Sequence, residues 1–119
     1  MRMMLITALL TLSWTMARAH DQASIVGAGT HTCAQFGKDY QADPEGEEVS
    51  YFTWAQGLMS GYNAIASIND LPQVNTSAMS IKEQLAHIRL YCNEHPLAFY
   101  VTAVDDLMEA MMPAIAHNR

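Results

Sequence analysis

Basic residues are scarce in this chain, with 6 Lys and Arg against 12 Asp and Glu among 119 residues. Nucleic acids and anionic lipid surfaces are bound largely through Lys and Arg side chains that neutralise phosphate charge. An acidic chain repels both. We therefore expect neither nucleic acid nor a membrane surface as a partner.

Long apolar runs are missing after the first 19 residues. Residues 1–19 combine a positive Arg2, a short apolar run and the triplet Ala17-Arg18-Ala19, which is typical of a cleaved signal peptide. The run is too short to span a bilayer. We expect export through a cleaved signal peptide and a mature chain of residues 20–119. Without the two arginines of the leader, that chain has 4 basic against 12 acidic residues, a net charge of −8 with neutral histidine.

Cysteine is limited to Cys33 and Cys92. In an oxidising compartment an even number of cysteines indicates a disulfide. A Cys33–Cys92 bridge would close a loop of about 60 residues and stabilise the fold by roughly 4 kcal/mol. The alternative is two free thiols.

Strand-like alternation with a period of two is absent from the sequence, whereas apolar residues recur with helical spacing. The fold class predicted is all-α: a small bundle of about four helices closed by one disulfide. Residues 20–29 lack a clear period and are expected to form a mobile N-terminal segment, followed by a single helical domain over residues 30–119. The helices are expected at about 30–40, 48–68, 77–92 and 96–112.

Local signals support these boundaries. Thr30 or Thr32 could cap the first helix, and Ser80 with Glu83 forms a candidate capping box for the third. The third and fourth helices each carry an apolar face. Those faces comprise Ile81, Leu85, Ile88 and Cys92, and then Leu97, Val101, Val104, Leu107, Met108 and Met111.

The second predicted helix carries two glycines on one stripe. Trp54, Gly57, Leu58, Gly61, Ile65 and Ile68 fall on the same face at helical spacing, and Tyr62 follows Gly61. Each glycine costs a helix interior about 1 kcal/mol relative to alanine. Two such residues suggest close approach of a neighbour, either in simple core packing or in a groove that receives a ligand or a partner.

Catalytic motifs are absent: the sequence has no G-x-S-x-G and no H-E-x-x-H. Asp105 and Asp106 are adjacent on a helix and point about 100° apart, so they do not form a dyad. We expect no enzyme and no cofactor, and we place Asp106, Glu109, His87 and Arg89 on solvated faces.

Two places in the sequence carry residues that could bind a metal ion. Glu83 and His87 share a helix face, but nearby Cys92 is better used in a disulfide and His95 lies in a helix-breaking turn. Cleavage after Ala19 would leave His20 at the N-terminus, where an amine and an imidazole can bind copper, and His31 or His117 could join. Both signals are weak, and we expect no metal.

Two short elements carry a family resemblance. Trp54-x-x-Gly57-x-x-x-Gly61-Tyr62 and Tyr91-Cys92-x-x-His95-Pro96, together with the leader, Cys33 and a last amphipathic helix, resemble the HdeA/HdeB-like family of small exported helical proteins. The resemblance covers about residues 33–112. It implies one disulfide, an all-helical fold and a periplasmic location. Its best-known members are acid-stress chaperones, folded dimers near neutral pH that expose apolar surface in acid.

The function expected is therefore a periplasmic, acid-stress chaperone-like protein that binds unfolded clients at low pH. The chain departs from such chaperones in having only two mature lysines, Lys38 and Lys82. The alternative is a periplasmic immunity or inhibitor protein that binds a toxic cell-wall amidase, although that class usually has more cysteines. Both hypotheses need protein clients or one protein partner, and a homodimer is open.

Overall fold

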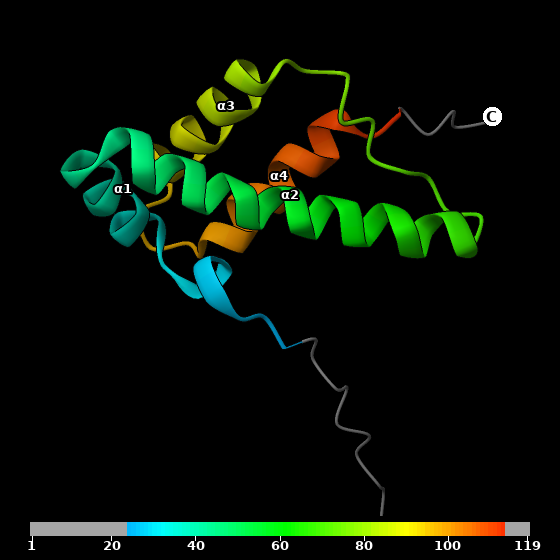
Figure 1. Ribbon diagram of the computed structural model, residues 1–119, viewed down its shortest axis with the longest axis horizontal. Coiled ribbons are helices and arrows are strands. Elements are labelled where there is room, and N and C mark those ends of the chain that lie inside the picture. The colour runs from blue at the N-terminus through cyan, green and yellow to red at the C-terminus, as the bar shows by residue number, and fades with distance from the viewer. Residues whose placement is uncertain (1–23, 114–119) are drawn as a thin grey trace, which may run out of the picture.

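The computed structural model describes residues 24–113, which form four α-helices and one short 3-10 helix (Figure 1). These elements are η1 (Gly27–Thr30), α1 (Cys33–Ala42), α2 (Pro44–Ile68), α3 (Ile81–Glu94) and α4 (Tyr100–Met111). Residues 24–113 contain no strand, only an isolated antiparallel bridge between Thr32 and Phe99. The all-α prediction is confirmed. The predicted leader, residues 20–23 and His117 lie outside the described residues.

Side-chain caps fix the starts of three helices. Thr32 accepts a hydrogen bond from the Gln35 backbone N–H at the start of α1, and Ser80 and Glu83 form the predicted capping box of α3. Asp43 caps α2 through the Gly46 N–H, with Pro44 in the first turn. Helix α2 therefore begins four residues before the expected Glu48, because proline is well tolerated at the first helical position.

Helix α4 begins at Tyr100 rather than at Pro96, so the prediction that its apolar face includes Leu97 was wrong. Residues 96–99 instead pair with the start of α1: Cys33 N–H donates to Ala98 O, and Ala34 N–H donates to Pro96 O. Ala98 N–H also donates to His95 O, so the segment forms a turn before α4, and Leu97 is 89% exposed.

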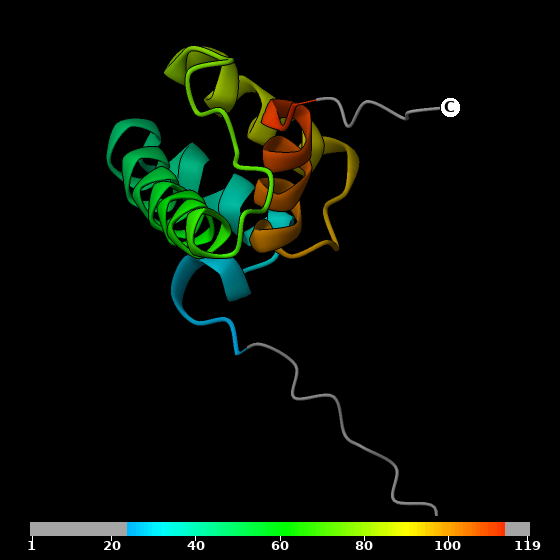
Figure 2. The ribbon, with the colours of Figure 1, turned by 90° about the vertical axis from the view of Figure 1, so that its right-hand side faces the viewer.

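The helices pack around one core. Helix α3 packs on α1 and α4, whereas α2 packs mainly on α1, η1 and α4 and barely approaches α3 (Figure 2). The centre is aromatic, with Tyr51 4.9 Å from Tyr100 and Phe36 5.0 Å from Tyr51 between ring centroids. Met108 and Met111, which the sequence predicts on the apolar face of the last helix, are buried in this core. No helix in the described range is both long and apolar enough to cross a bilayer.

The buried stripe of α2 differs from the predicted one. Tyr51, Ala55, Met59 and Ala66 are buried, which displaces the stripe by one residue, or about 100° around the helix. Gly57 and Gly61 are exposed, and a Cβ atom built at either would meet nothing within 4 Å. The expectation of a close neighbour at these glycines was wrong within this chain. The small residues of α2 itself, alanine, serine and glycine, occur on all sides of the helix, so its sequence indicates no single apolar face.

Gly61→Leu is consequently expected to keep the fold and to raise the free energy of unfolding by up to about 1 kcal/mol, because leucine is a better helix former than glycine. Urea unfolding measures this. The matched control is Ala55→Leu, at a fully buried position on the same helix, which should destabilise by about 1–3 kcal/mol through overpacking. Equal destabilisation by both variants would contradict the exposed position of Gly61.

Residues 24–30 lie against α2 instead of extending freely from the domain. Trp54 Nε1 donates to Val26 O at 2.9 Å. Gly29 is buried, and a Cβ there would overlap the Trp54 indole. The segment expected to be mobile is therefore anchored from Val26 onward, with Gly29 required by the close approach of the ring.

The connection between α2 and α3 is also held in place. The Asn63 side-chain amide pairs with both backbone groups of Val74, donating to its carbonyl at 2.9 Å and accepting from its N–H at 2.8 Å. Val74 is buried against the core. This irregular segment runs back along α2 and so sets where α3 begins.

Candidate functional site

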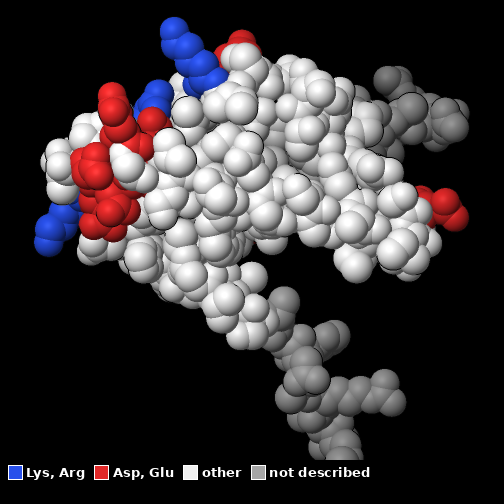
Figure 3. All heavy atoms as spheres, viewed as in Figure 1, with Lys and Arg blue, Asp and Glu red and all other residues white. Residues whose placement is uncertain are grey.

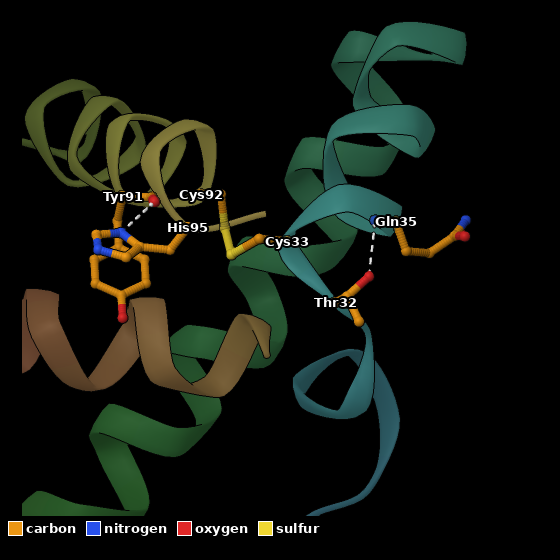
Figure 4. Close-up of a disulfide and its surroundings, with 6 residues drawn as sticks. All are labelled: Thr32, Cys33, Gln35, Tyr91, Cys92 and His95. Atoms are coloured by element: carbon orange, nitrogen blue, oxygen red, sulfur yellow. Dashed lines mark hydrogen bonds between the residues drawn. A yellow bond between two sulfur atoms is a disulfide. The ribbon is translucent and has the colours of Figure 1, made fainter. Parts of the chain in front are cut away.

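The disulfide predicted from the two cysteines is present (Figure 4). It joins Cys33, the first residue of α1, to Cys92 near the end of α3, and their Cα atoms are 4.7 Å apart. Both cysteines are buried. Beside the bridge, the His95 ring stacks on Tyr91, at 4.3 Å between centroids, and contacts Tyr91 O at 3.0 Å. This end of the bundle is covalently closed.

Carboxylates make the other side-chain links between helices. Among residues 24–113, every side-chain to side-chain hydrogen bond that joins two α-helices uses one. The first is the bond from Tyr51 Oη on α2 to Asp39 on α1, at 2.7 Å. The second joins His87 on α3 to Asp106 on α4, also at 2.7 Å. The third joins Arg89 on α3 to Glu48 on α2.

Two of these links differ from what the sequence predicts. The sequence predicts solvated faces for His87, Arg89 and Asp106, yet each of these side chains connects two helices. Arg89 is half-buried and also lies over the Tyr40 ring, 5.7 Å from its centroid. The aliphatic stem of a charged side chain can pack in this way while its head stays paired. Glu109 is exposed as expected.

Tyr51 forms the centre of a short hydrogen-bonded chain. Its hydroxyl donates to Asp39 Oδ2 and lies 2.6 Å from His31 Nδ1. Because the phenol has a single proton, the imidazole must be the donor in the His31 contact. Gln35 Nε2 donates to the other oxygen of Asp39 at 2.6 Å. Burial, then the hydrogen bond to Asp39, raise the pKa of Tyr51 well above its usual value.

Alkaline conditions should therefore unfold the protein. The Tyr51 pKa is raised in the folded state, so the stabilisation is present below the ordinary tyrosine pKa of about 10 and decreases as pH rises above it. Burial also raises the pKa of Tyr100, which adds to the effect. We expect phenolate absorbance from these two residues to appear only together with loss of helical circular dichroism. Tyr51→Phe should show a weaker dependence on pH above 10. Phenolate formation at Tyr51 in a fully folded protein would contradict this.

Two further carboxyl groups have shifted pKa values of opposite sign. Hydrogen bonds from Ser80 lower the pKa of Glu83. The capping box therefore stabilises α3 at neutral pH, and this stabilisation is lost as pH falls through the lowered pKa. Desolvation, then the charge of Glu109, raise the pKa of Asp105. Neither group links two helices.

The residues predicted as a packing or binding helix do not form one site. Trp54 holds the N-terminal segment, and the half-buried Tyr62 donates from its hydroxyl to Pro72 O at 3.2 Å, so it holds the following connection. Gly57 and Gly61 lie on an open surface with Ile65 and Ile68, which are 60% and 78% exposed. We call these four residues the outer face of α2.

Charge is absent from this part of the molecule. No residue between Glu48 and Asp70 is charged. Figure 3 shows acidic and basic side chains over the end where α1 and the start of α2 lie and at the top, and an acidic group at the far end of α2, while the middle of the molecule has neither. The folded protein thus presents an uncharged surface along α2 that contains exposed isoleucines.

A metal site does not form among residues 24–113, where no three His, Cys, Asp or Glu side chains come together. Glu83 caps α3, His87 pairs with Asp106, and Cys92 is in the disulfide. His20, considered for copper, lies outside the described residues.

Comparisons with protein-family models, with curated proteins and with solved structures found no match for this chain.

Proposed function

We propose that this protein is a periplasmic, acid-activated binding protein that holds unfolded clients, as its resemblance to HdeA/HdeB-like proteins implies. The observation that carries the proposal is the chemistry of the helix-to-helix links. All three depend on a carboxylate, namely Asp39, Glu48 or Asp106. A carboxyl group with the ordinary pKa of about 4 is neutral near pH 2. Strong acid thus weakens all three links together.

Net charge acts in the same direction. The proposed mature chain changes from −8 at neutral pH to about +10 near pH 2, when its carboxylates are neutral and its five histidines, four basic side chains and N-terminal amine are positive. Like-charge repulsion then favours a more open form.

The disulfide limits this opening because acid does not break it. Cys33 and Cys92 continue to join α1 to α3, so the chain loosens without separating completely. Separation of the helices would uncover Phe36, Tyr100 and the buried methionines of α4. Such apolar and adaptable side chains suit unfolded clients of varied sequence.

Light scattering of an acid-sensitive client tests the proposal. We expect suppression of client aggregation at about pH 2–3 and little at pH 7, because only the acid form exposes the core. Reduced and alkylated protein serves as the control for disulfide-limited opening. Equal aggregation with and without this protein at low pH would remove the chaperone proposal.

The outer face of α2 favours a second candidate, an inhibitor of a cell-wall amidase. Gly57, Gly61, Ile65 and Ile68 are exposed in the folded protein, so a partner could bind at neutral pH without any opening. Gly61→Leu should then fold normally and lose inhibition of the amidase. The same face would suit a homodimer. Sedimentation at pH 7 measures the oligomeric state of wild type and of Gly61→Leu. Inhibition unchanged by this variant would exclude the outer face as the inhibitory surface.

A further inference from the structure

A groove lies between α2 and α3 where the two helices diverge. The Arg89–Glu48 pair ties them at one end. Beyond it, toward the start of α3, a space of about 270 Å³ remains, lined by Gln56, Met59, Ser60, Thr76, Ile81 and Gln84. This is slightly below the usual range for sites that enclose a drug-sized ligand. It is the right size for a short segment of chain.

The lining defines the kind of ligand. None of the six residues is ionisable, and an ion brought here would lose hydration without gaining a partner of opposite charge. Met59 is buried at the base, and Ile81 is 57% exposed at the rim, so both offer apolar contact. The lining also includes an amide residue, Gln56, and two hydroxyl residues, Ser60 and Thr76, whose side chains can donate and accept hydrogen bonds. The groove therefore suits an uncharged ligand with both apolar and hydrogen-bonding groups.

Gln84 adds a specific requirement. Its side chain is only 4% exposed, and its Nε2 donates to Thr76 O at 3.1 Å and to Met79 O at 2.9 Å. Two carbonyl acceptors fix the orientation of the amide, which leaves Oε1 without a donor among residues 24–113. No fully enclosed side-chain oxygen in that range lacks a partner, so Oε1 keeps some access to solvent. Gln84 is among the residues that line the groove. A ligand N–H would satisfy this acceptor.

We propose that the groove binds an extended, uncharged peptide segment, whose backbone N–H donates to Gln84 Oε1 and whose apolar side chain contacts Met59 and Ile81. The spacing on α2 fits such a chain. Gln56 and Ser60 are one helical turn apart, which separates their Cβ atoms by about 5–6 Å. An extended chain repeats its backbone groups on one side every two residues, or about 6.6 Å.

This inference deepens the proposed function and rests on it: the groove is the first attachment point for a client segment, present before acid opens the core. One short groove holds a segment weakly. Protection from aggregation needs the larger surface that opening supplies.

Fluorescence anisotropy with a labelled, end-blocked peptide of Leu, Val, Ser and Thr tests the groove at pH 7. Ser60→Trp fills it from an exposed position on α2, and Ser67→Trp is the matched control, also exposed but outside the lining. We expect Ser60→Trp to weaken binding at least tenfold, a change of about 1.4 kcal/mol, and Ser67→Trp to bind as wild type does. Thermal unfolding checks that both variants fold.

Two altered peptides test the chemistry. A peptide with one central backbone nitrogen methylated lacks the N–H for Gln84, and a peptide with a central aspartate carries a charge. Both should bind more weakly than the parent peptide. Wild-type affinity of Ser60→Trp, or equal binding of all three peptides, would overturn the proposal.

The aggregation assay separates this inference from the function on which it rests. If wild type suppresses aggregation in acid and Ser60→Trp does so equally, the groove is not the attachment point and the chaperone function stands. If wild type binds the peptide but suppresses no aggregation, the chaperone function fails and the peptide site remains.

Discussion

Replacing Cys33 with serine is expected to lower the free energy of unfolding by about 2–5 kcal/mol. The bridge spans 59 positions and lies in the buried core, so its loss both frees the unfolded chain and leaves a polar group beside Phe36. A domain of this size is usually stable by only about 5–15 kcal/mol. Chemical denaturation at pH 7 measures the difference, with reduced wild-type protein as the comparison.

The same variant should behave differently in acid. Without the bridge, no covalent bond joins α1 to α3. Loss of the carboxylate links also removes the hydrogen bonds that hold α1 to α2 and α3 to α2 and α4, so the chain should unfold fully near pH 2. Circular dichroism would show less helix than in acid-treated wild type. If the free energies of unfolding of Cys33→Ser and wild type differ by less than about 0.5 kcal/mol, the bridge stabilises the fold far less than its loop length predicts.

The second large effect is expected from neutralising the three linking carboxylates together. Asp39→Asn, Glu48→Gln and Asp106→Asn keep side-chain shape but remove the charges paired with Arg89 and His87 and weaken the bond from Tyr51. Hydrogen bonds to charged groups contribute about 1.5–3 kcal/mol when formed. The triple variant should therefore open at neutral pH and suppress client aggregation at pH 7, where wild type has little effect.

The control must change the net charge equally without touching a link. Asp70→Asn, Glu94→Gln and Glu109→Gln do so, because all three residues are exposed and their side chains join no helices. This variant should remain closed and inactive at pH 7. If both triple variants behave alike, net charge rather than the links controls opening.

Local signals in the sequence identified most of the helices. Thr32, Ser80 and Glu83 act within one turn of chain, so their capping bonds could be predicted without knowledge of the fold. The pairing of Cys33 with Cys92 followed from their being the only two cysteines in the proposed mature chain.

Contacts between distant residues could not be predicted in this way. Arg89 and Glu48 are 41 positions apart, and His87 and Asp106 are 19 apart, so nothing local distinguishes them from solvated charges. The late start of α4 depends on backbone bonds to α1, which override a continuous apolar pattern through Leu97. On α2, small residues occur on every side, so the sequence did not distinguish the buried face from the one displaced by one residue.

The disulfide divides the chain into a covalent ring and a segment on each side of it. Cys33 and Cys92 close the ring around α1, α2 and most of α3, η1 precedes it, and α4 follows it as a C-terminal arm. A protease cut within the ring leaves the two pieces joined until the bridge is reduced, whereas a cut between Cys92 and Tyr100 releases α4 at once. The fragments formed by an acid-active protease thus distinguish an acid form that opens within the ring from one that detaches the arm.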